Sequence, residues 1–150
     1  MKVRCINNTG ADLREFEKDQ IISKEIFGRF GVSSYASYEI LIGMSYLVMG
    51  IVIFESYQAY LIDDRGFVDV YPCQLFEVED NIINPKSYYR VIEKEETIYP
   101  FVQAVLGYQE FCLDKNSYEK LIIEKEEDAI QTYFRRKTEL EEYYKSLDSE

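Results

Sequence analysis

Carboxylates are the most numerous side chains in this sequence that could take part in catalysis, and many of them lie in short clusters. A pair of carboxylates can hydrolyse a glycosidic bond, with one acting as the acid and the other as nucleophile or base. Here, however, lysines are interleaved with the acidic residues, which is typical of a solvated surface. We therefore predict no catalytic pair in any of the clusters, which are Glu77–Asp80, Glu93–Glu96, Glu124–Asp128 and Glu139–Glu142.

Patterns for nucleophilic catalysis and metal binding are missing from the sequence. The 150 residues contain no histidine, which excludes Ser-His-Asp and Cys-His catalysis and histidine metal ligands. Cys5, Cys73 and Cys112 are far apart, which disfavours a disulfide framework or a zinc site and suits a reducing compartment. The glycines form no phosphate loop, and Asp63–Gly66 lacks the alternating oxygen ligands of a calcium loop. We predict a protein that is not an enzyme, with no catalytic residue, no cofactor and no metal.

The charge balance restricts the class of partner. With 17 basic and 28 acidic side chains the net charge is −11, which phosphate backbones and anionic membranes repel. The charge either serves solubility alone or attracts a basic protein. The N-terminus lacks the apolar core of a signal peptide, and the longest apolar run, Tyr46–Phe54, is far shorter than the ~20 residues of a membrane helix. We expect a cytoplasmic protein that binds neither nucleic acid nor membrane.

Strand signals occupy the first 94 residues. Asp63–Gly66 reads as a tight turn, with Gly66 in the left-handed position of a bulged hairpin. Pro72 ends the strand before it, because proline removes a donor from the ladder. In the last strand, Tyr89, Val91 and Glu93 share one face. The predicted strands are Lys2–Ile6, Tyr46–Phe54, Tyr57–Ile62, Phe67–Tyr71, Leu75–Val78 and Tyr88–Glu93.

Helical signals are strongest at the C-terminal end. Apolar residues at three- and four-residue steps predict a helix over Ile130–Tyr144. Lys137 interrupts the apolar stripe, although its stem is able to cover apolar surface. We expect this helix to pack on the sheet through Ile130, Tyr133 and Leu140.

The domain organisation follows from these signals. Phe101–Phe111 is ambiguous between helix and strand, because Gly107 interrupts an apolar run. We expect a single domain over residues 1–150, with a β-rich part at 1–94 and a helical part at 95–150. Within the β-rich part, Ala11–Ser37 has only a weak helical pattern and is interpreted as an insertion that packs on the strands. Its apolar residues are Leu13, Phe16, Ile21, Ile22, Ile26, Phe27 and Phe30.

Four of the segments together resemble a small SH3-like β-barrel: Lys2–Ile6, Ile42–Val48, Tyr60–Gly66 and Tyr71–Val78. In such barrels a proline placed like Pro72 leads into a short 3₁₀ turn and a closing strand. The resemblance implies an α+β fold, with an SH3-like, partly open antiparallel β-barrel followed by C-terminal helices. We expect the barrel core to contain Val3, Cys5, Tyr46, Val48, Leu61 and Phe76.

The whole chain, including Gly107–Glu110 and the helical end, is similar to a group of small uncharacterised bacterial proteins that occur as immunity proteins beside polymorphic toxins. This similarity implies a protein-binding inhibitor that neutralises a cognate toxin, such as a basic toxin domain, by direct contact. The alternative is a general SH3-like interaction or regulatory module without enzymatic activity. Proline-peptide recognition does not fit, since the chain has no tryptophan to build the groove.

The hairpin tip is the predicted partner surface. Asp63 and Asp64 supply negative charge at a turn, and Tyr57, Tyr60 and Tyr71 on the flanking strands supply aromatic anchors. In the alternative interpretation, the tyrosines fill the sheet faces and the aspartates only shape the turn.

Overall fold

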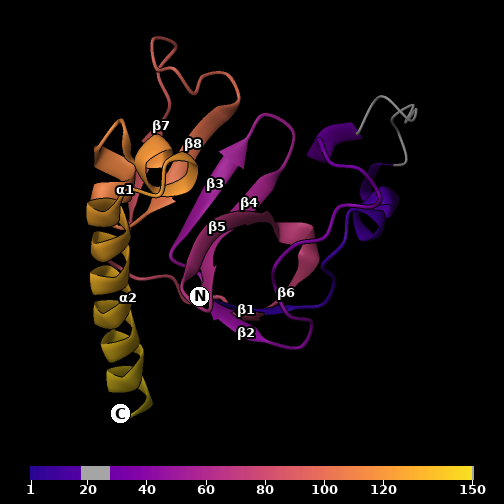
Figure 1. Ribbon diagram of the computed structural model, residues 1–150. Helices are drawn as coiled ribbons and strands as arrows, with labels where there is room; N and C mark the ends of the chain where they lie inside the picture. Colours follow the sequence, from indigo (N-terminus) through magenta and orange to yellow (C-terminus); the bar gives the residue numbers. More distant parts are fainter. Residues whose placement is uncertain (18–27, 150) are drawn as a thin grey trace.

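A computed structural model describes residues 1–17 and 28–149, and shows an α+β fold with two antiparallel sheets and C-terminal helices (Figure 1). The first sheet has three strands. Strand β1 (Lys2–Cys5) is central and pairs with both β2 (Ser45–Leu47) and β6 (Phe76–Asp80).

The second sheet has five strands in the order β5-β4-β3-β8-β7, so β5 and β7 are its edges. The strands of the two sheets, as far as the structure describes them, do not form a closed barrel. The bounds are β3 (Gly50–Phe54), β4 (Gln58–Asp64), β5 (Phe67–Pro72), β7 (Tyr88–Val91) and β8 (Val102–Gly107).

Short helices connect the strands, and one long helix ends the chain. Two 3₁₀ helices, η1 (Ala11–Glu17) and η2 (Gly28–Phe30), lie on the opposite side of the sheets from the long helix (Figure 1). The 3₁₀ helix η3 (Cys73–Leu75) joins β5 to β6, as Pro72 predicted. None of the helices within 1–17 and 28–149 is long and apolar enough to cross a membrane. The remaining helices are α1 (Gln109–Leu113), the π-helix η4 (Glu119–Ile123) and the long helix α2 (Glu127–Asp148).

The insertion predicted at Ala11–Ser37 packs against the first sheet through the part that the structure describes. Leu13 and Phe30 are buried in the same cluster as β1 and β6 side chains. Phe16 is exposed. The other apolar positions named for this segment, Ile21, Ile22, Ile26 and Phe27, lie outside the described residues.

Two hydrophobic cores lie on the two faces of the five-stranded sheet. The first is shared with the three-stranded sheet, and the second is shared with the helices. Strand β4 contributes to both, because successive side chains of a strand point to opposite faces: Tyr60 and Ile62 enter the first core and Leu61 the second. The six predicted core residues are all buried, with Val3, Cys5, Tyr46, Val48 and Phe76 in the first core and Leu61 in the second.

The predicted C-terminal helix is confirmed. Helix α2 includes the whole of Ile130–Tyr144. Tyr133 and Leu140 are buried in the second core, and Ile130 is half-buried against it. The apolar stripe therefore packs on the sheet as its spacing predicted.

The division into a β-rich part at 1–94 and a helical part at 95–150 is wrong, because β8 lies after residue 94 and pairs with β3. Gly107 is the last residue of this strand and still pairs with β3. It stands opposite Gly50, and a Cβ on Gly50 would lie 2.9 Å from the Leu106 carbonyl oxygen and 3.3 Å from the Phe111 ring. The two glycines therefore let Phe111 of α1 approach the sheet closely.

The predicted strand Tyr46–Phe54 is divided into β2 and β3, which belong to different sheets. The break falls at Val48 and Met49, directly before Gly50. A glycine in a strand often marks such a bend.

Candidate functional site

The β4–β5 hairpin, predicted to present acidic side chains, has a two-residue turn at Arg65 and Gly66. Asp64 pairs with Phe67, and the strands remain in register without a bulge. Arg65 and Gly66 have positive φ angles of 49° and 88°, as a type I′ turn requires. The left-handed Gly66 is confirmed, but the bulge is not. Asp63 and Asp64 thus belong to strand β4 rather than to the exposed tip.

Asp63 points from β4 toward helix α2. Its Oδ1 accepts a hydrogen bond of 2.9 Å from the Tyr133 hydroxyl and an ion-pair contact of 2.7 Å from Lys137 Nζ. The side chain is only 8% exposed. Burial, together with the nearby Asp63 carboxylate, raises the pKa of Tyr133, so the phenol remains a donor. Asp63 therefore joins the hairpin to α2.

Asp64 points to the opposite face and is only 5% exposed as a side chain. Its Oδ1 accepts a 3.0 Å hydrogen bond from the Tyr46 hydroxyl, which itself accepts one from the Leu41 N–H. Burial, with a contribution from Asp64, raises the pKa of Tyr46 to about 12. The second aspartate is therefore held inside the first core.

The three predicted tyrosine anchors are also inward. Tyr60 and Tyr71 are buried in the first core, and Tyr57 is half-buried with its ring against Phe30 and Phe54. The expectation that the aspartates project into solvent is wrong. The geometry agrees with the alternative in which the tyrosines fill sheet faces, because β4 has a packed layer on both sides.

A groove of about 490 Å³ lies between the hairpin, β2 and α2. Charged groups of both signs line it, so it presents no field of a single sign to a charged ligand. These groups are Lys2, Arg65, Lys137 and Lys145 with Asp63, Asp64, Glu141 and Asp148.

The other end of the five-stranded sheet has an apolar face that the described residues cover only in part. Cross-strand pairing aligns Ile51 with Leu106 and Tyr89, and it aligns Ile53 with Val91 through Ala104. Directly paired residues share a face. Tyr89 and Val91 are 58% and 61% exposed, and the other three large side chains are half-buried. We call this surface the open sheet face, and it consists of Ile51, Ile53, Tyr89, Val91 and Leu106.

The open sheet face continues into a hollow of about 310 Å³ at the start of β7. Ile51 and Leu106 line it together with Ile83 and Pro85 from the preceding loop. Ile83 is exposed as well. Apolar surface thus extends from the sheet to this loop.

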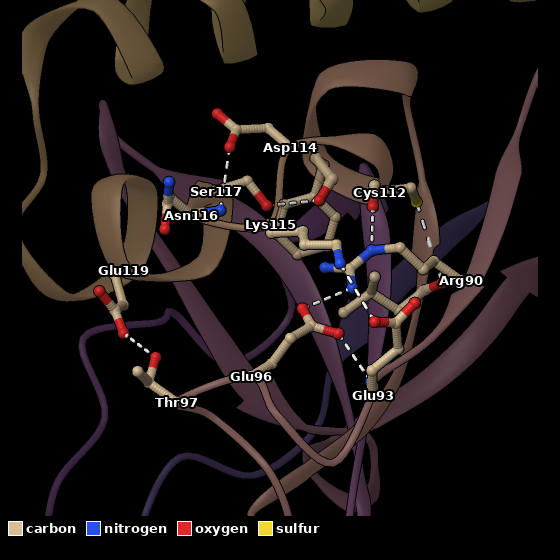
Figure 2. Close-up of polar contacts among 12 residues, drawn as sticks. Arg90, Glu93, Glu96, Thr97, Cys112, Asp114, Lys115, Asn116, Ser117 and Glu119 are labelled. Carbon is tan, nitrogen blue, oxygen red and sulfur yellow. Dashed lines mark hydrogen bonds and ion pairs between the residues drawn. The ribbon is translucent and has the colours of Figure 1, made fainter.

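On the covered face of β7, Arg90 connects the strand to Cys112 of α1 and to Glu96 in the connection between β7 and β8 (Figure 2). Arg90 Nη1 lies 2.5 Å from Glu96 Oε1, and Arg90 Nε donates to the Cys112 carbonyl oxygen. Glu96 Oε2 accepts a 2.6 Å hydrogen bond from the Glu93 N–H. The Cys112 thiol donates to the Tyr88 carbonyl oxygen at 3.3 Å. Strand β7 is therefore held from one side and open on the other.

The protonation state of Glu96 follows from these contacts. Burial disfavours the carboxylate, but hydrogen bonds from Arg90 and from the Glu93 N–H outweigh it and hold the pKa of Glu96 below its ordinary value. The pair is consequently ionised at neutral pH.

The sequence contained part of the signal for the open sheet face. Tyr89 and Val91 were assigned to one face of a strand, but the adjacent strand β8 was not predicted. Without β8, nothing in the sequence connected them to Ile51 and Ile53.

Among residues 1–17 and 28–149, no group of three or more histidine, cysteine or carboxylate side chains is placed to hold a metal ion. In comparisons with known proteins, no family model, no curated protein and no solved structure matches the chain.

Proposed function

We propose that this chain is a non-enzymatic, protein-binding inhibitor of the immunity type, which neutralises a cognate toxin by direct contact. The open sheet face is the observation that carries the proposal. Tyr89 and Val91 are largely exposed within a set of apolar neighbours, and contiguous exposed apolar surface marks interaction sites. Tyrosine is also enriched in protein interfaces.

An SH3-like, partly open barrel belongs to the same proposal. Strand β1 pairs with β2 and β6, and the chain continues from β2 into β3, which pairs with β4. Strand β5 then leads through η3 into β6. This order of pairing supports the SH3-like arrangement, to which β8 and β7 add two strands on the β3 side.

The charge supports a basic partner in the cytoplasm. A net charge of −11 attracts a basic domain at long range and speeds the encounter. The open sheet face then supplies short-range contact, because its apolar side chains lose water on binding. The resemblance to immunity proteins supports a toxin as this partner.

The experiment is co-expression with the product of the gene upstream of this chain, which the proposal identifies as the toxin domain. We expect the wild-type chain to restore growth and to co-purify with the toxin domain. The double variant Tyr89→Thr/Val91→Thr places a β-branched residue suited to a strand at both positions but removes most of the apolar contact, so it should neither restore growth nor co-purify with the toxin domain. Ile42→Thr is the matched control, since Ile42 is also 61% exposed but lies in the loop before β2.

Three outcomes would count against the proposal. Without co-purification of the wild-type chain, toxin inhibition by direct contact is wrong. Rescue by the double variant as good as that by Ile42→Thr would place the contact elsewhere. Binding without any rescue of growth would favour the general interaction or regulatory module instead.

A further inference from the structure

The two sheets present four edge strands among the described residues: β2, β6, β5 and β7. Edge strands have unpaired backbone groups, and proteins protect them with short length, charge, proline or a cover. Strand β2 has only three residues, and β6 includes Glu77, Glu79 and Asp80.

Strand β5, the third edge, contains Asp69 and ends in Pro72. Helix η4 packs against it, and Lys125 Nζ donates to the Val68 carbonyl oxygen. The sequence of β7 is Tyr88-Tyr89-Arg90-Val91, and Glu96 holds the charge of Arg90 on the covered face. Strand β7 is also short, at four residues, but it contains no proline and no charged residue other than Arg90.

The backbone of β7 presents its free groups at the same residues as the open sheet face. The Ile92 N–H donates to the Gln103 carbonyl oxygen at 2.9 Å. Residues of an antiparallel pair alternate between facing the partner strand and facing away. Given the register of β7 with β8, Tyr89 and Val91 direct their N–H and C=O groups away from β8. Each offers one donor and one acceptor to another strand.

We infer that the toxin partner binds by adding an extended segment as a further strand on the β7 edge, with its apolar side chains continuing the open sheet face. This inference rests on the proposed function for the identity of the partner. Strand addition supplies main-chain hydrogen bonds, and alternate side chains of the added strand supply specificity. The segment has apolar residues at every second position.

The charge argues for a basic partner rather than a second copy of the chain. Two copies would each bring a charge of −11 to the same interface, and like charges repel. A basic domain carries the opposite charge and is attracted to this chain. The template is also pre-organised, because the Arg90–Glu96 pair fixes β7 before binding, and rigid edges lose little entropy on association.

The experiment measures amide hydrogen exchange of the full chain, alone and with the purified product of the upstream gene, which the proposed function identifies as the toxin domain. We expect the amides of Tyr89 and Val91 to exchange rapidly in the free protein and at least about tenfold more slowly in the complex, as a new hydrogen bond requires. The amide of Ile92 already donates to Gln103, so it is the internal control.

Val91→Pro tests the same hydrogen bond. Proline is tolerated at an edge position whose N–H faces outward, so β7 should still pair with β8. We expect Val91→Pro to weaken binding about tenfold more than Val91→Ala, which keeps the N–H.

The outcomes separate this inference from the proposed function. If the toxin domain binds but Tyr89 and Val91 gain no protection, strand addition is overturned and the proposed function stands. If the toxin domain does not bind at all, both are overturned. Should Val91→Pro fail to fold, hydrogen exchange of the wild-type chain still decides.

Discussion

The β4–β5 hairpin and strand β7 belong to the two ends of the same five-stranded sheet. In the hairpin, Asp63 and Asp64 are charged but buried, and each has a hydrogen-bonding partner from another element. In β7, Tyr89 and Val91 are apolar but exposed. The hairpin therefore buries charged side chains, whereas β7 exposes apolar ones.

The number of packed layers explains this difference. Strand β4 lies between the three-stranded sheet on one side and α2 on the other, so its side chains after the exposed Gln58 meet protein on both faces. Charges in such a place persist only when paired. Strand β7 has α1 on one side, whereas on the other side the described residues leave Tyr89 and Val91 exposed. The two regions therefore differ in the number of layers packed on the strand, rather than in residue type alone.

The largest effect is expected in the hairpin. Asp63→Ala should lower the free energy of unfolding by about 3–5 kcal/mol, because it leaves Lys137 and the Tyr133 hydroxyl without their acceptor. Urea unfolding measures this change. Glu142→Ala, an exposed position on the same helix, is the control and should change stability by no more than about 0.5 kcal/mol. An equally small loss for Asp63→Ala would mean that the carboxylate is not held by α2.

The cover itself is tested at Leu140 on α2. Leu140 is buried in the second core, so Leu140→Ala should cost about 2–5 kcal/mol through lost burial and a cavity. Thermal or urea unfolding provides the measurement. A cost within about 0.5 kcal/mol, the range for surface substitutions, would show that α2 does not cover the sheet.

An intermediate effect is expected on the covered side of β7. Glu96→Gln should cost about 1.5–3 kcal/mol at neutral pH, as a hydrogen bond to a charged group does. The pKa of Glu96 in the folded protein lies below the ordinary value of 4.5. Its stabilisation is therefore complete above pH 4.5 and disappears as the pH falls through the folded-state pKa.

Urea unfolding of both proteins between neutral and acid pH checks this dependence. The difference between the wild-type chain and Glu96→Gln should become smaller below about pH 4.5. A difference that is constant across this range would exclude an ionised Glu96 as its source.

Local patterns in the sequence predicted much of the fold. The alternation in β1, the left-handed Gly66 in the β4–β5 turn and the helical period of α2 all depend on neighbouring residues. All six predicted core residues are buried and five of them share one core, whereas Leu61 lies in the other, and the C-terminal helix is where its period predicted.

The site depended on long-range contacts, which local patterns do not contain. Asp63 meets Tyr133 and Lys137, which are 70 and 74 residues further along the chain. Lys137 within an apolar stripe was the one local signal of a buried acceptor. Likewise, the open sheet face exists only because β8 joins β3 to β7. Strand β8 was not predicted, because Gly107 left its apolar run ambiguous between helix and strand.

The smallest effect on stability is expected on the open side of β7. Tyr89→Thr/Val91→Thr should change the free energy of unfolding by no more than about 0.5 kcal/mol, since both side chains are exposed and threonine suits a strand. Val105→Thr is the matched comparison, because Val105 pairs with Arg90 of β7 and is buried in the second core. That variant places a hydroxyl in an apolar site and should cost about 1–3 kcal/mol. Unfolding in urea compares the two proteins directly. If the double variant loses as much stability as Val105→Thr, Tyr89 and Val91 are covered in solution, and the contrast between the two regions fails.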